Sequence, residues 1–200
     1  MSRLVLASSN RGKLDELREL LASAGHELIA QSDLGVDDAE ETGTTFIENA
    51  LIKARHAAHV TGLPALADDS GLLVDALDGA PGLLSARYAG GHGNAHANNA
   101  LLLERLRDVG TNQRGAHFYC VLVLLRRADD PQPAIAEGVW RGSILEDLRG
   151  AHGFGYDPLF LPDGHTLSAA ELDPVLKNRI SHRGRALAVL RDRLVEATRC

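Results

Sequence analysis

The sequence predicts an α/β fold, because short apolar strand patterns and helical patterns mix along its 200 residues. The apolar run at residues 4–7 is broken by a polar, glycine-containing stretch at residues 8–12, after which leucines recur at helical spacing. Two longer strand patterns, residues 116–125 and 134–140, flank a turn cluster around Asp129 and predict a long hairpin. The length suits one domain with a sizeable core, and we expect a single domain over residues 1–200.

The other elements follow from the same periodicities and turn signals. Thr44 or Thr45 is expected to cap the second helix, and the glycine-rich residues 78–96 predict an exposed loop. In the first part of the chain we expect a strand at residues 4–7, a helix carrying Leu14, Leu17, Leu20 and Leu21, and a strand near residues 28–30. A helix with Phe46, Ile47, Ala50, Leu51 and Ala54 on one face should follow, and then a strand from residue 64 and a helix over residues 101–106. After the hairpin we expect a short strand around Leu159 and helical segments that end in an amphipathic helix at residues 185–197.

Composition excludes several classes of protein. No apolar run approaches bilayer length and the start lacks the long apolar region of a signal peptide, so we expect a cytoplasmic protein without membrane contact. The net charge of −6 argues against broad attraction to nucleic acid. Cys120 and Cys200 are the only cysteines, which predicts neither a disulfide framework nor a thiolate metal site.

Residues 67–71 (Ala-Asp-Asp-Ser-Gly) carry the most informative chemistry. Two adjacent carboxylates follow an apolar run and precede what reads as a glycine turn. Carboxylate oxygens are ligands that Mg²⁺ prefers, with substrate phosphates completing its shell. Asp, Ser and Gly also make ordinary turns, so taken alone the motif leaves both interpretations open. If the two aspartates stay extended, only one can face a metal directly.

Residues 8–13 lie between a buried strand and a helix, where free backbone amides and the helix dipole favour an anion such as phosphate. The stretch is not a Walker A loop, because Leu14 stands where that motif has Ser or Thr. A purely structural helix start is an equal alternative. Two interpretations are also open for Glu40, Glu41 and Lys53. They are either charged side chains solvated at the surface or groups that the fold brings close to Asp69.

Residues 153–158 (Gly-Phe-Gly-Tyr-Asp-Pro) form an aromatic loop that could stack on a flat heterocycle. An aromatic ring packed over a turn is the alternative. Lys177, Ser181, His182 and Arg183 add hydrogen-bond donors before the last helix, or else form a basic helix start exposed to water.

Together these segments resemble the inosine triphosphate pyrophosphatase family, known as the HAM1 or RdgB type. The resemblance covers nearly the whole chain. Ordinary turns, helix caps and surface charges would have no reason to occur together in this order, so the motifs taken together support the resemblance. The motifs that carry it are Ser8–Lys13, Glu41–Ala54, Ala67–Gly71, Ala80–Tyr88, Gly153–Pro158 and Ser181–Gly184.

The resemblance implies hydrolysis of noncanonical purine nucleoside triphosphates to the monophosphate and pyrophosphate. It also implies Mg²⁺ as cofactor, a homodimer, and an elongated mixed β-sheet with flanking helices that form two lobes around a central cleft. No nucleic acid or membrane partner is expected. The first motif has Ser8 and Ser9 where many relatives have Thr and Gly.

The family's roles fall on matching positions of this sequence. Asp69 is the expected proton acceptor for the attacking water and, with Glu41, the expected metal ligand, although Glu40 adjoins Glu41 and stays an alternative. Donors such as Arg183 or a backbone amide are expected to favour the oxygen at the six position of the purine. The expected substrate-binding residues are Ser8, Ser9, Asn10, Arg11, Gly12, Lys13, Lys53, Ser70, Phe154, Gly155, Tyr156, Asp157, Lys177, His182 and Arg183.

Two other functions remain open from the sequence. A nucleotide sensor would use the same contacts without turnover, but Glu41, Asp69 and Lys53 speak against it. A general phosphohydrolase would release orthophosphate as its first product, whereas the favoured function predicts pyrophosphate.

Overall fold

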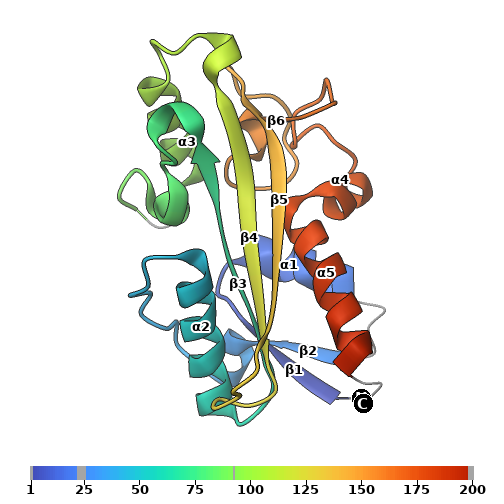
Figure 1. Cartoon of the computed structure of the whole chain (residues 1–200). Helices are drawn as coiled ribbons and strands as arrows, with labels where there is room; N and C mark the ends of the chain where they lie inside the picture. The colour runs from blue at the N-terminus through green and yellow to red at the C-terminus, as the bar shows by residue number, and fades with distance from the viewer. Residues whose placement is uncertain (1, 22–25, 92, 198–200) are drawn as a thin grey trace. The chain divides into compact units, whose positions relative to one another are not determined.

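A computed structural model describes residues 2–21, 26–91 and 93–197. Six strands form one sheet in the order β2-β1-β3-β4-β5-β6, with helices beside it (Figure 1). β1 pairs in parallel with β2 and β3, whereas β5 and β6 are antiparallel, so the sheet is mixed. The predicted α/β class and mixed sheet are confirmed, while the central cleft and the single domain stay predictions.

The chain divides into two compact units, which we describe separately. Unit 1 comprises residues 1–69, 120–138 and 183–200, and unit 2 comprises residues 70–119 and 139–182.

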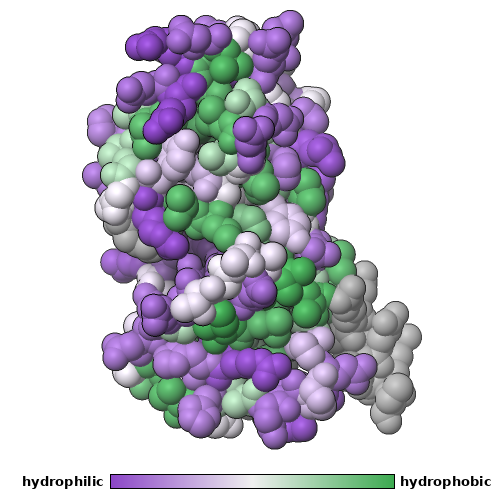
Figure 2. All heavy atoms as spheres, turned by 60° about the vertical axis from the view of Figure 1, so that its left-hand side comes forward, coloured by the Kyte–Doolittle hydropathy of each residue, from purple (hydrophilic) through white to green (hydrophobic). Residues whose placement is uncertain are grey.

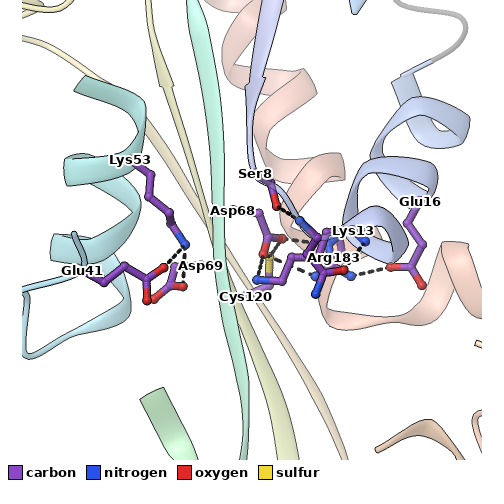
Figure 3. A network of polar contacts seen from close by, with 10 residues as sticks. Ser8, Lys13, Glu16, Glu41, Lys53, Asp68, Asp69, Cys120 and Arg183 are labelled. Carbon is purple, nitrogen blue, oxygen red and sulfur yellow. Dashed lines mark hydrogen bonds and ion pairs between the residues drawn. The ribbon is translucent and has the colours of Figure 1, made fainter. Parts of the chain in front are cut away.

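In unit 1, β1 (Ser2–Ala7) lies between β2 (His26–Ala30) and the start of β3 (Ala65–Val74). Residues 4–7 are buried throughout, as expected of a parallel strand covered on both faces. Leu17 of α1 (Arg11–Leu21) and Leu187 of α5 (His182–Ala197) join the same apolar cluster. α2 (Phe46–Thr61) lies on the other side of β3 (Figure 3). Thr45 caps α2 and exchanges hydrogen bonds with Glu48, which confirms the predicted cap.

Unit 2 contains α3 (Ala95–Arg105), α4 (Pro174–Ile180), β6 (Phe160–Pro162) and parts of β3, β4 (Gly115–Leu125) and β5 (Ala134–Ile144). Its core is aromatic, with Phe118 packed against Trp140 and Phe160. The predicted strand pair is confirmed, because β4 and β5 are consecutive neighbours in the sheet.

Two sequence predictions need correction. The glycine-rich stretch at residues 78–96 is not a plain exposed loop, because Gly82–Arg87 forms a largely half-buried 3₁₀ helix and α3 begins at Ala95. Gly71 is not a turn residue, because β3 has strands on both sides and continues to Val74. Asp68, Asp69 and Ser70 therefore lie inside a strand.

The surface is mixed in character, and apolar residues are interspersed with polar ones on the face shown in Figure 2. Among the described residues, every helix is too short or too polar to cross a bilayer.

Candidate active site

β3 presents its two adjacent aspartates to opposite sides of the sheet (Figure 3). Successive side chains of an extended strand alternate between faces, and Asp68 and Asp69 obey this rule because β3 continues through them. Asp69 points toward α2, whereas Asp68 points toward α1 and α5. The two carboxylates therefore meet different cations.

On the α2 side, Lys53 brings Asp69 and Glu41 together. Lys53 Nζ lies 2.7 Å from Asp69 Oδ1 and 3.0 Å from Glu41 Oε1. Burial raises the pKa of Asp69, and the Lys53 charge opposes that shift. Burial opposes the charge on Lys53, but the two carboxylates outweigh it and raise the lysine pKa. The cluster thus gathers two carboxylates around one ammonium group.

The two carboxylates of this cluster are donors that fit Mg²⁺. Two carboxylates already converge on one cation, and Mg²⁺ is commonly held by one or two carboxylates together with phosphate oxygens. Within residues 2–21, 26–91 and 93–197, no group of three or more His, Cys, Asp or Glu side chains could hold a metal. The remaining ligands of such an ion would be water or substrate oxygens. Glu41 is half-buried against Lys53, whereas Glu40 is exposed, so the geometry favours Glu41.

On the other side of β3, Asp68 is the centre of a buried polar network. Its carboxylate lies 2.7 Å from Lys13 Nζ and 2.7 Å from Arg183 Nε, and accepts a hydrogen bond from Cys120 Sγ at 3.1 Å. Arg183 also pairs with Glu16. Burial would raise the pKa of Asp68, but Arg183 and Lys13 outweigh it and hold this pKa well below its usual range. Burial likewise raises the pKa of the Cys120 thiol, so the thiol stays protonated and donates.

The first turn of α1 has a structural role in the described residues. Asn10 Oδ1 accepts a hydrogen bond from Lys13 N at 3.1 Å, which is an N-cap interaction, and Ser8 Oγ accepts one from Asn10 N at 3.2 Å. Ser9 Oγ donates to Asp38 at 2.7 Å, and Arg11 is exposed. Phosphate binding by residues 8–13 stays a prediction.

In unit 2, the loop at residues 153–157 is built around a buried ion pair. Asp157 Oδ2 lies 2.7 Å from Lys177 Nζ and accepts a hydrogen bond from Phe154 N at 2.9 Å. Lys177 Nζ also lies 5.3 Å from the centre of the Phe154 ring, within the range of a cation–π contact. Gly153 has φ +75°, and a Cβ there would lie 2.1 Å from Asp157 Oδ2. Only glycine fits this position.

The alternative of a solvated basic segment at residues 177–183 is wrong. Lys177, Ser181, His182 and Arg183 are all at least nine-tenths buried. The His182 ring stacks on Phe118 with a centroid distance of 4.8 Å. Arg183 belongs to unit 1, where Asp68 and Glu16 engage its guanidinium. A contact between Arg183 and a purine base stays a prediction.

Comparison with known proteins decides the family. Residues 4–193 match the model of the Ham1 family. The chain belongs to the Ham1 family. It is 62% identical to a dITP/XTP pyrophosphatase of Xanthomonas campestris pv. campestris, over 97% of this chain and 98% of that protein. A dITP/XTP pyrophosphatase of Vibrio cholerae is 52% identical over the full length of both chains.

Solved structures agree with this assignment. A HAM1 protein from Coxiella burnetii has 51% identity and a TM-score of 0.89, covering 98% of this chain and 100% of that chain. A Ham1 protein from Staphylococcus aureus has 36% identity and a TM-score of 0.85, with the same coverage. These matches confirm the resemblance drawn from the motifs and the α/β fold.

Sequence reasoning missed several partners in this Ham1 protein. Glu16 and Cys120 were not expected in the site, and Asp68 had no assigned partner, yet all three belong to one network. Strand alternation indicates that Asp68 and Asp69 diverge, but no local signal pairs Asp68 with Arg183, which lies 115 positions away. No pattern in the sequence indicated that Phe118 would stack on His182.

Asp68→Ala should lower the free energy of unfolding by about 3–5 kcal/mol, because it leaves Arg183 and Lys13 without their buried counter-charge. Urea denaturation measures this change. Asp129→Ala is the matched control, because that aspartate pairs with Arg127 at the surface, where such pairs contribute about 0–1 kcal/mol. Equal losses in the two variants would show that the Asp68 network does not hold unit 1 together.

Proposed function

We propose that this protein is a Mg²⁺-dependent pyrophosphohydrolase of noncanonical purine nucleoside triphosphates. It would convert inosine, deoxyinosine and xanthosine triphosphates to the monophosphate and pyrophosphate, and so keep these nucleotides out of DNA and RNA. The observation that carries the proposal is the convergence of Asp69 and Glu41 on Lys53, in a chain 62% identical to a dITP/XTP pyrophosphatase.

Asp69 is the proposed proton acceptor for the attacking water. Its Oδ1 binds Lys53, while its Oδ2 accepts no hydrogen bond from any residue in the described ranges. That oxygen is therefore available to orient a water or take its proton. Burial raises the pKa of Asp69, which makes the carboxylate a better base than a solvated one.

Unit 1 supplies the proposed phosphate contacts. Lys53, Lys13 and residues 8–12, which lead into α1, would neutralise and orient the triphosphate. Ser70, the first residue of unit 2, is the one further proposed contact. Glu41 and Asp69 would hold Mg²⁺, which when bound neutralises phosphate charge and favours departure of pyrophosphate. Positioning and electrostatics would account for most of the rate.

Unit 2 supplies most of the proposed base contacts. Phe154 offers a stacking face, and the Asp157–Lys177 pair fixes the loop that carries it. Gly155 and His182 belong to the same unit, and Arg183 of unit 1 is the remaining proposed donor. A site that hydrogen-bonds a substrate group discriminates by about 10⁴ or more against an analogue that leaves its groups unpaired.

The proposal includes a cytoplasmic homodimer with one nucleotide-hydrolysing domain per chain, as the family implies. The net charge of −6 supports action on free nucleotides rather than on nucleic acid.

The first test is initial rates with Mg²⁺ on inosine, xanthosine, guanosine and adenosine triphosphates, with pyrophosphate and orthophosphate quantified separately. We expect rapid pyrophosphate release from the inosine and xanthosine substrates only. Orthophosphate from all four would instead indicate a general phosphohydrolase, and binding without turnover would indicate a sensor.

Asp69→Asn should lower kcat by about 10²–10⁴-fold, the usual contribution of a general base, because the amide cannot take the proton. The side chain keeps its shape, so circular dichroism should show an unchanged fold. Turnover close to that of the wild type would remove Asp69 from the mechanism.

Glu41→Gln should raise the Mg²⁺ concentration needed for half-maximal pyrophosphate release, because an amide oxygen is a weaker ligand than a carboxylate. Glu40→Gln is the matched control, since the adjacent Glu40 side chain is exposed. A Mg²⁺ titration of both variants separates them. A larger shift in Glu40→Gln would assign the metal to Glu40 instead.

A further inference from the structure

Ser85 links several segments of unit 2, although the proposed function gives it no role. It lies in the 3₁₀ helix Gly82–Arg87, within a family motif without an assigned site residue. Ser85 Oγ accepts a hydrogen bond from Leu72 N at 2.9 Å and donates one to Gly82 O at 2.5 Å. Leu72 lies in β3, three residues beyond Asp69. The Ser85 side chain therefore ties its helix to the strand that carries the proposed catalytic carboxylate.

The Ser85 carbonyl ties the same helix to the loop at residues 153–157. Tyr156 Oη donates a hydrogen bond to Ser85 O at 2.9 Å, and Asn98 Nδ2 donates a longer one to the same oxygen at 3.3 Å. α3 adds another tether to this loop, because Asn99 Nδ2 donates to Gly155 O at 2.9 Å. The loop is thus held from both α3 and the 3₁₀ helix.

Tyr156 is buried and hydrogen-bonded in a way that can hold the loop in place. Only 4% of it is exposed, and its ring packs in the aromatic and aliphatic core of unit 2 with Leu72 and Leu102. Burial raises the pKa of Tyr156, so its hydroxyl stays protonated and can donate at any pH of interest. A ring this buried cannot stack on a base, whereas the half-buried ring of Phe154, two residues earlier, belongs to the proposed base site.

We infer that Tyr156 and Ser85 are positioning residues that fix the loop at residues 153–157 relative to β3 within unit 2. They act through Phe154 and Asp157 on binding of the purine base, and leave the phosphate contacts of unit 1 unchanged. This inference rests on the proposed function, because it needs the loop to contact the base. It assigns Tyr156 a role different from direct substrate contact.

Tyr156→Phe tests the inference with one lost hydroxyl. The remaining Asn98 bond still satisfies the Ser85 carbonyl, so no buried group loses its only partner. We expect KM for inosine triphosphate and the dissociation constant of inosine monophosphate, measured by calorimetry, each to rise roughly threefold to tenfold, the worth of one hydrogen bond. We expect kcat and the inhibition constant of tripolyphosphate, a ligand without a base, to stay within about twofold.

Tyr88→Phe is the matched control. Tyr88 packs against the same core and is half-buried, but its hydroxyl makes no hydrogen bond to a residue of the described ranges. Ser85→Ala is the second variant, since it removes the bond to Leu72 N and should raise the same two constants. If Ser85→Ala fails to fold, the Tyr156→Phe variant by itself still tests whether the loop is positioned by this hydrogen bond.

The outcomes separate the two proposals. A wild-type protein that releases no pyrophosphate from inosine triphosphate would overturn the proposed function. An active wild type, in which Tyr156→Phe matches Tyr88→Phe in KM and in affinity for inosine monophosphate, would overturn this inference alone. An equal loss of tripolyphosphate affinity in Tyr156→Phe would also overturn it, because the effect would then not be confined to the base.

Discussion

The alternation of side chains along β3 is the constraint on which the proposed site depends. The strand stays extended through residues 68 and 69, so its two carboxylates point to opposite faces. Asp68 meets Lys13 and Arg183, and Glu16 balances the second positive charge. Asp69 meets Lys53, which it shares with Glu41. The two faces of one strand thus carry different networks of charged side chains.

This separation gives adjacent, identical side chains different chemistry. Asp68 is completely buried, and its two cations keep it ionised, so it connects α1 and α5 to the sheet. Such buried ion pairs specify position more than they add stability, because desolvation offsets their attraction. Asp69 pairs directly with Lys53, which it shares with Glu41, and burial raises its pKa. The same residue type is therefore structural at one position and, we propose, catalytic at the next.

The loop of unit 2 follows a related rule, in which a buried charge pair fixes the backbone around it. Asp157 binds Lys177 and the Phe154 amide, and this arrangement requires Gly153 because a Cβ would collide with the carboxylate. Tyr156 is buried in the core of unit 2 and donates a hydrogen bond to the Ser85 carbonyl. Charged and aromatic residues that are neighbours in the motif thus divide between the site and the scaffold.

Sequence patterns alone predicted the α/β class, most of the elements, a cap of α2 at Thr44 or Thr45, and the divergence of Asp68 from Asp69 wherever the strand stays extended. Those features depend on local periodicity, on capping chemistry and on the two-residue repeat of a strand, which are written in neighbouring residues. Three contacts come from the packing of the folded chain: Arg183 pairs with Asp68, Cys120 donates to the same carboxylate, and Tyr156 bonds to Ser85. These partners lie far apart along the chain, and the packing of strands and helices, not any local pattern, brings them together.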